Sequence, residues 1–348
     1  MSTPSRTGGG GISRCSACST TNGVPGGTNS RTPSPKPDIA DDRAEELSLL
    51  TTLESTVWVL VAKELGRPPE LGELFTAFDQ HLPGRWQLRH PDELLVAVKD
   101  GRLLVLDHTG TRLPPPRTVC ACLASPTLHT DREITLLRQL SALGAVIVNP
   151  IDATLTAVNK FWQLQQFATH GLPMPDTVTY AHGTVEAALP AAPPTGPYVV
   201  KAVRGNRGKR VFLAPDRTLL TDISGSLGQD VPSMLQEYIE NSHGRHLRIY
   251  VMDGAVVSTV ERTARDDRLT SNRYQGATSE FCTGRYPAAE ELATQAAAAT
   301  GLVIAGVDIL FRDEGTPALC EVNSFPGWDR ENTRVPDAIA RLIAARSN

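Results

Sequence analysis

The 348-residue sequence predicts a small α/β domain followed by α+β units, and two observations support this fold class. In residues 45–152, strand patterns alternate with helix patterns, which is typical of an α/β domain with a largely parallel sheet. In the rest of the chain, strands joined by turn residues are mixed with helices, which indicates antiparallel α+β units. A chain of this length exceeds one comfortable hydrophobic core, so we expect two or three subdomains.

The composition excludes several classes of protein. Hydrophobic residues make up 40% of the chain and the formal net charge is −4, which argues against a general nucleic-acid or membrane-surface binder. No apolar run is long enough to span a bilayer, and the first residues lack the apolar core of a secretory signal. The six cysteines form no plausible disulfide framework, and Cys15 and Cys18 alone are too few ligands for a structural zinc site. We therefore expect a cytoplasmic protein.

Residues 1–44 are rich in Ser, Thr, Gly and Pro, with almost no large apolar side chains. Such a segment cannot bury enough surface to offset its ordering entropy, so we expect it to be disordered. In the α/β domain that follows, strand signals lie at 57–62, 94–98, 103–107, 118–123 and 145–148, and helix signals at 70–78 and 131–143. This domain contains no recognisable catalytic constellation.

A second expected subdomain spans residues 153–236. A helix is predicted over 157–169, with Gly171 as its C-cap. Further along, a strand at 198–203 leads into the basic, glycine-rich segment 204–210, and a second strand follows. This segment suits a loop that covers phosphate groups with backbone N–H groups and cations, although an exposed basic hairpin would have the same composition. It matches neither a Walker nor a Rossmann loop.

Two lysines flank this segment in ways that favour a polyphosphate ligand. Lys201 lies in the middle of an apolar strand, where a lysine is costly to bury unless it is paired with an anion. Lys160 begins the preceding helix.

A third subdomain is expected over residues 237–348. Strands at 247–252 and 255–261 flank Asp253-Gly254, a strong signal for a two-residue hairpin turn. The resulting register places His246 opposite Glu261 and Arg248 opposite Thr259. A polar stretch over 262–285 is expected to be a long loop without regular structure. Helices are predicted over 288–300 and 336–346.

The last predicted hairpin, within residues 306–323, brings acidic side chains together. With Glu314-Gly315 at its tip, Asp308 lies directly opposite Glu321, and Asn323 follows on the same face. Like charges in direct opposition are destabilising, and a divalent cation would remove the conflict, since two carboxylates and an amide oxygen suit Mg²⁺ or Mn²⁺. A solvated acidic pair on an exposed face is the alternative.

Seven short segments complete the pattern by following one another in a fixed order. They are Asn159-Lys160, Val199-Val200-Lys201, Leu235 to Ile239, Gly244 to Arg248, Ser271-Asn272, Ala305 to Asp308, and Glu321 to Gly327. This order resembles that of ATP-grasp carboxylate–amine ligases, above all the RimK-like glutamate ligases and their relatives in lysine biosynthesis. The resemblance covers about residues 150–345.

The resemblance implies an ATP-grasp fold, in which two α+β subdomains (153–236 and 237–348) clasp ATP after a pre-ATP-grasp α/β domain (45–152). It implies phosphate contacts from Lys160, Lys201, Gly205 and Gly208, and adenine contacts from Glu237, Tyr238 and Ile239, with the Glu237 carboxylate accepting from the exocyclic amine. It also implies that Asp308, Glu321 and Asn323 hold two Mg²⁺ ions, which Mn²⁺ would replace. Arg262, Arg248 and Asn272 become candidates for contacts to the acyl phosphate and the substrate carboxylate.

The implied reaction is ATP-dependent ligation. A carboxylate attacks the γ-phosphate to give an acyl phosphate and ADP, and an amine then attacks that carbonyl, forming an amide or peptide bond and releasing phosphate. The expected partners are a small-molecule carboxylate or a peptide and an amino acid such as glutamate, with homo-oligomerisation left open. The alternative hypothesis is an ATP-binding regulatory or scaffold module that kept the fold and lost ligation.

Two positions depart from the family pattern. His246 stands on the nucleotide side of the site where an acidic residue is common, and we expect it to pair with Glu261. Thr270 replaces an arginine that often precedes the Ser-Asn pair. The first departure leaves nucleotide preference open, and the second leaves acceptor specificity open.

Overall fold

The computed structural model of the protein describes residues 57–63, 69–123, 128–179, 188–191, 196–205, 208, 210–227, 231–273 and 276–348. The expected disorder of residues 1–44, the Cys15/Cys18 pair and three residues of the basic loop (206, 207 and 209) lie outside these ranges. Within them, none of the helices combines the length and the apolar character that crossing a membrane requires.

The predicted α/β domain is built on a parallel sheet, as expected. Its strand order is β2-β1-β6-β7, and all neighbours run parallel. The strands are β1 (Val57–Val61), β2 (Trp86–Arg89), β6 (Thr118–Cys122) and β7 (Val146–Val148). Strand β2 was not predicted, because its half-exposed residues give no clear apolar run.

Both faces of β1 are buried, and each face packs against different helices. Val57 and Val59 share a core with Leu74 of α2 (Pro69–His81), whereas Trp58 shares a core with Leu137 of α3 (Glu133–Ala142). This explains the continuous apolar run, since a strand covered on both faces loses its alternation.

A separate antiparallel sheet in the same domain has the order β3-β4-β5. Its strands are β3 (Leu94–Lys99), β4 (Arg102–Asp107) and β5 (Arg112–Leu113), and a single 3₁₀ turn, η3 (Pro91–Glu93), precedes them. The β3–β4 hairpin turns at Asp100 and Gly101, which both have positive φ. Both of its strands were predicted.

The helix predicted over 157–169 is two helices, α4 (Ile151–Val158) and α5 (Lys160–Thr169), so that prediction was wrong. The break lies at Asn159, whose backbone is extended (φ −111°, ψ 109°). Its side-chain oxygen accepts from the N–H groups of Phe161 (3.0 Å) and Trp162 (3.1 Å), and this N-cap starts a new helix. Lys160 is therefore the first residue of α5. Gly171 follows the helix with φ 66°.

A four-stranded antiparallel sheet with the order β10-β9-β11-β8 carries the glycine-rich loop. Its strands are β8 (Thr177–Thr179), β9 (Tyr198–Ala202), β10 (Val211–Ala214) and β11 (Ser233–Glu237), accompanied by η5 (Leu189–Ala191) and helix α7 (Arg217–Leu227). Its small core contains Val200, Leu220 and Leu235.

The third sheet is antiparallel, has five strands and runs β14-β13-β12-β15-β16. The strands are β12 (Arg245–Met252), β13 (Ala255–Thr263), β14 (Thr278–Phe281), β15 (Ile304–Phe311) and β16 (Pro317–Asn323). The 3₁₀ turns η6 (Glu240–Ser242) and η8 (Asp313–Gly315) lie beside it. Strand β14 lies inside the stretch that was predicted to be a loop. As an exposed edge strand it has no alternating apolar pattern that would reveal it.

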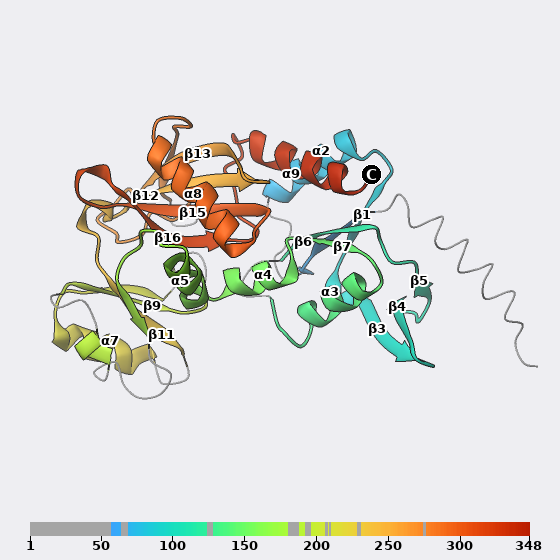
Figure 1. The fold of residues 1–348 in the computed structure, drawn as a ribbon, viewed down its shortest axis with the longest axis horizontal. Coiled ribbons are helices and arrows are strands. Elements are labelled where there is room, and N and C mark those ends of the chain that lie inside the picture. Colours follow the sequence, from blue (N-terminus) through green and yellow to red (C-terminus); the bar gives the residue numbers. More distant parts are fainter. Residues whose placement is uncertain are drawn as a thin grey trace, which may run out of the picture. The chain divides into compact units, whose positions relative to one another are not determined.

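The two faces of this sheet differ in chemistry. One face packs apolar residues such as Ile249 and Val307 against α8 (Pro287–Thr300) and α5, and Figure 1 shows α8 beside β12 and β15. The C-terminal helix α9 (Arg334–Arg346) lies beside α2, and Ile339 shares a core with Tyr250 and Leu74. The other face packs Tyr250, Met252, Val260 and Ile304 into this same core with α9 and α2, and beside them it carries the polar side chains that form the site described below.

Candidate active site

The β15–β16 hairpin places Asp308 directly opposite Glu321, as predicted. Its details differ from the prediction. The turn is one residue longer, because Arg312 N–H donates to the Thr316 carbonyl (2.7 Å) and three residues lie between them. Cys320 is an extra residue in β16, forming a bulge between the Asp308–Glu321 and Ile309–Leu319 pairs. These two shifts of one residue cancel at the acidic pair.

The β12–β13 hairpin has the predicted turn, with positive φ at Asp253 (50°) and Gly254 (78°). A bulge at Val257, however, shifts the register by one residue beyond it. His246 therefore lies opposite Arg262, and Arg248 lies opposite Val260, so both predicted pairs were wrong.

The shift also decides which face each side chain occupies, because a slip of one residue moves a side chain to the other face. Arg262 joins the polar face of the sheet. Glu261 lies on the opposite face, where it accepts hydrogen bonds from Arg245 Nε (2.5 Å) and Tyr286 Oη (2.7 Å). The expected His246–Glu261 pair does not form.

Two rows of directly opposite residues cross the sheet at the site. One row is Val260, Arg248, Asp308 and Glu321, and the next is Ser258, Tyr250, Gly306 and Asn323. Gly306 belongs here because Pro326 lies so close that a β-carbon would overlap it. The first row alone brings three charged side chains, those of Arg248, Asp308 and Glu321, side by side on one face.

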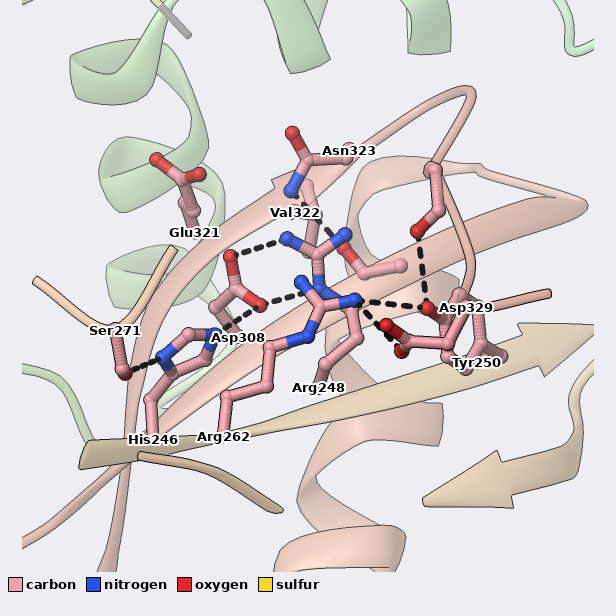
Figure 2. Close-up of polar contacts among 12 residues, drawn as sticks. His246, Arg248, Tyr250, Arg262, Ser271, Asp308, Glu321, Val322, Asn323 and Asp329 are labelled. Carbon is pink, nitrogen blue, oxygen red and sulfur yellow. Dashed lines mark hydrogen bonds and ion pairs between the residues drawn. The ribbon is translucent and has the colours of Figure 1, made fainter. Parts of the chain in front are cut away.

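Asp308 is buried and held by cations (Figure 2). Arg248 donates to both carboxylate oxygens, Nε to Oδ1 at 2.5 Å and Nη2 to Oδ2 at 2.8 Å. His246 Nε2 lies 3.5 Å from Oδ1, while its Nδ1 is 2.6 Å from Ser271 Oγ. Burial alone would raise the pKa of Asp308, but the charge of Arg248 and then that of His246 lower it.

Glu321 has a different cation. Lys160 Nζ lies 2.8 Å from Glu321 Oε2 and donates to the Gly205 carbonyl at 3.2 Å. Burial would raise the pKa of Glu321, but Lys160 lowers it below the ordinary value, while the nearby charge of Asp308 opposes this. The repulsion predicted between Asp308 and Glu321 is therefore present, and neighbouring cations outweigh it. Asn323 Nδ2 donates to the Gly306 carbonyl at 3.4 Å.

Lys201 adds a further positive charge. Its side chain is 4% exposed, and among the described residues no carboxylate lies within ion-pair distance of its ammonium group. Its charge nevertheless contributes to lowering the pKa of Glu321. The three cations Lys160, Lys201 and Arg248 thus face two carboxylates, which leaves an excess of positive charge for an anionic ligand.

The arginine end of the site surrounds the predicted Arg262 with three residues that sequence reasoning missed, namely Tyr250, Arg273 and Asp329. Arg262 Nη2 donates to Tyr250 Oη (3.2 Å) and lies 3.4 Å from Asp329 Oδ2, while its buried Nε has no hydrogen-bond partner in the described part of the chain. Arg273 Nη1 donates to the Trp328 carbonyl (2.6 Å). Tyr250 shares the two-residue spacing of His246 and Arg248 and so had a sequence signal, whereas Asp329 had none.

At the other end of the site, Glu237 is already engaged. Its carboxylate accepts two hydrogen bonds from Arg312 (3.0 and 2.8 Å) and one from the Asp176 N–H (3.1 Å). Next to it, Tyr238 Oη lies 2.8 Å from His243 Nδ1.

One cavity of about 310 Å³ collects these groups. All fourteen predicted site residues line it: Lys160, Lys201, Gly205, Gly208, Glu237, Tyr238, Ile239, His246, Arg248, Arg262, Asn272, Asp308, Glu321 and Asn323. The α/β domain also contributes, through Leu71, Cys122 and Leu123, a wall that was not predicted. Within the described ranges, no cluster of three or more His, Cys, Asp or Glu side chains could hold a metal ion, so the candidate metal set is two carboxylates and the Asn323 amide.

Comparison with known proteins gives a consistent family. The model of the RimK-like ATP-grasp domain matches residues 157–345. N-acetylaspartylglutamate synthase A of Mus musculus is 37% identical over 242 residues, covering 68% of this chain and 63% of that protein. Beta-citrylglutamate synthase B of Danio rerio is 35% identical over 242 residues, covering 68% and 59%. The matched stretch is thus about 60% of the length of these relatives.

Solved structures agree at the level of the fold. D-cycloserine synthetase DcsG superposes with a TM-score of 0.62 at 19% identity, covering 84% of this chain and 100% of that one. The ATP-grasp ligase PsnB, solved with a precursor variant, Mg and ADP, superposes with a TM-score of 0.60 at 17% identity, covering 85% and 100%.

Proposed function

The chain belongs to the RimK-like ATP-grasp family, and on that premise we propose that it is an ATP-dependent ligase joining a carboxylate to an amino group. The observation that carries this proposal is the cavity, in which buried cations outnumber carboxylates around Lys201. The names of the relatives N-acetylaspartylglutamate synthase, beta-citrylglutamate synthase and probable alpha-L-glutamate ligase favour glutamate as the amine.

The triphosphate of ATP fits the lysine side of the cavity. Lys160 and Lys201 supply positive charge, and Gly205 and Gly208 allow the backbone to approach the phosphates closely. No described residue gives the Lys201 ammonium group an anionic partner, and a buried ammonium group in that state is costly, so Lys201 supports an anionic ligand at this position.

Mg²⁺ would be held by Asp308, Glu321 and Asn323, whose oxygen atoms are hard ligands that suit this ion. The adjacent pairs Asp308–Glu321 and Gly306–Asn323 bring these side chains to one edge of the polar face. The ions, two in this proposal, would neutralise negative charge on the phosphates during transfer. In the structure, Arg248 pairs with Asp308 and Lys160 pairs with Glu321. Metal ions bound to these carboxylates would free both cations to contact the phosphates.

Adenine would lie against Tyr238 and Ile239, in the short segment after β11 that leads from one expected subdomain to the next and that we call the hinge. The salt bridge from Arg312 occupies the Glu237 carboxylate, so we assign the polar contacts with adenine to the backbone of this segment. Glu237 would then act by holding the hinge in place.

The substrate carboxylate would lie at the arginine end. Arg262 has a buried Nε without a partner among the described residues, and Arg248 and Asn272 line the same cavity. These groups would orient the carboxylate toward the γ-phosphate and then stabilise the charge on the acyl phosphate that forms. No serine or cysteine nucleophile is needed, since an amine attacks the activated carbonyl and phosphate leaves.

A hydroxylamine trap tests the proposal. Protein, ATP and Mg²⁺ are incubated with candidate carboxylates, such as N-acylated acidic amino acids and tricarboxylates, with hydroxylamine in place of the amine. A ligase should form a hydroxamate and release ADP and phosphate in equal amounts. An ATP-binding module without ligase activity would gain thermal stability from ATP and yield neither product, and this result across the carboxylate panel would overturn the proposal. A second screen with amino acids, glutamate first, would identify the amine.

A further inference from the structure

A buried glutamine outside the predicted site touches the strand that carries two of the candidate metal ligands. Gln163 lies in α5, three residues after Lys160, and its side chain is 1% exposed. It does not line the cavity. The activity proposed above therefore leaves it without a role.

The side-chain amide of Gln163 pairs with both backbone groups of Val322. Val322 N–H donates to Gln163 Oε1 at 2.8 Å, and Gln163 Nε2 donates to the Val322 carbonyl at 3.0 Å. Its second N–H donates to the Ala157 carbonyl at 2.7 Å. The amide is thus fully used, and it pairs with Val322 as a neighbouring strand would.

The position of Val322 explains why such a partner is needed. Strand β16 is an edge of the five-stranded sheet, so every second residue turns its backbone groups away from β15. Val322 is one of these residues, and it lies between Glu321 and Asn323 (Figure 2). Without Gln163, two buried backbone groups would lack partners, and the strand could shift at this point.

We propose that Gln163 is a positioning residue, whose amide fixes the backbone between Glu321 and Asn323 so that both side chains meet the same metal ion. This inference rests on the metal site of the proposed function. Helix α5 would then serve the site twice, through Lys160 at its first turn and through Gln163 one turn later. Residues that orient metal ligands typically change metal affinity by about 10- to 100-fold when replaced.

The test is Gln163→Met, which removes both hydrogen-bonding groups at similar volume. Mn²⁺ binding to the protein loaded with a non-hydrolysable ATP analogue is measured from the electron paramagnetic resonance signal of free Mn²⁺. We expect the Mn²⁺ dissociation constant to rise about 10- to 100-fold. Binding of the analogue in EDTA should change little, because Lys160 is positioned by the Asn159 cap rather than by Gln163.

Gln139→Met is the matched control. The Gln139 amide donates to the carbonyls of Leu104 (2.6 Å) and Ala97 (3.3 Å) in the antiparallel sheet of the α/β domain, and it does not line the cavity. This variant should lower the melting temperature and leave Mn²⁺ binding unchanged. If Gln163→Met has the same two effects as Gln139→Met, then Gln163 is structural only and the inference is overturned.

Gln163→Glu provides a second variant in case Gln163→Met does not fold. It keeps the acceptor for Val322 N–H but places an oxygen against the Val322 carbonyl. An added negative charge would by itself strengthen cation binding, so weaker Mn²⁺ binding in this variant would report the lost pairing, and equal or tighter binding would contradict the inference. Failure of the wild-type protein to bind Mn²⁺ with the analogue would instead refute the metal site itself.

Discussion

The hairpins β12–β13 and β15–β16 of the five-stranded sheet both contribute side chains to the polar face, and each contains one bulge. In β15–β16 the bulge at Cys320 compensates for a turn that is one residue longer than predicted, so Asp308 faces Glu321 as expected. In β12–β13 the turn is as predicted, and nothing compensates for the bulge at Val257. The same kind of irregularity therefore preserved one predicted pair and changed another.

The comparison shows that a register read from a turn holds only as far as the first bulge. In β12–β13 the bulge brings Arg262 to the cavity and sends Glu261 to the other face. Without it, the acidic side chain of Glu261 would lie opposite His246 on the polar face, and the buried Arg262 would be absent from the site.

The largest expected effect is that of Asp308→Asn, which tests the hairpin whose register was preserved. We expect kcat to fall by more than about 1,000-fold, equivalent to about 4 kcal/mol, because the proposed metal site would lose one of its two carboxylates. The melting temperature should also fall, since Arg248 would remain buried without its counter-charge. Rates and thermal unfolding measure the two effects.

Asp313→Asn is the control for this variant. It makes the same change on an exposed residue at the turn of the same hairpin, where Asp313 accepts a hydrogen bond from Asn241 (3.2 Å). Its turnover should match that of the wild type. Wild-type turnover in Asp308→Asn would remove this residue from the metal site.

A smaller effect is expected from Arg262→Gln, compared with Glu261→Gln next to it. Arg262→Gln should lower kcat/KM for the carboxylate substrate by about 100-fold, or about 2.7 kcal/mol, because the buried guanidinium faces the cavity. Glu261→Gln should leave kcat/KM nearly unchanged. The opposite ranking in steady-state kinetics would mean that β13 lacks the bulge and presents its other face.

The smallest effect concerns the pH dependence of stability at Glu261. Burial would raise the pKa of this carboxyl, but hydrogen bonds from Arg245 and Tyr286 lower it below the ordinary value of about 4.3. Because the folded-state pKa is the lower one, the contribution to stability is complete above about pH 4.3 and is lost as the pH falls through the folded-state value.

Wild-type protein should therefore exceed Glu261→Gln in unfolding free energy by about 2 kcal/mol at pH 7, and the gap should close in acid. Urea unfolding at several pH values measures this difference. A gap that stays constant down to pH 3 would show that the carboxylate charge contributes nothing.

Much of the fold, and the set of residues that line the cavity, could be predicted from the sequence. Apolar runs and turn residues predicted the parallel sheet, the Asp253-Gly254 turn and the acidic hairpin, because periodicity and turn chemistry act over a few residues. The order of motifs indicated the family that the domain match confirms, and every predicted site residue lines one cavity.

Tertiary structure alone decided the rest. The pairing of Glu321 with Lys160 and the contact of Gln163 with Val322 join segments far apart in the chain, and the two bulges depend on how neighbouring strands pair. The pattern of side chains in a strand predicts which of them favour burial. It does not predict where a neighbouring strand will accommodate a bulge, or which helix will supply hydrogen-bond partners to an edge strand. For this reason the sequence determined which residues would line the cavity, and packing determined which of them face one another.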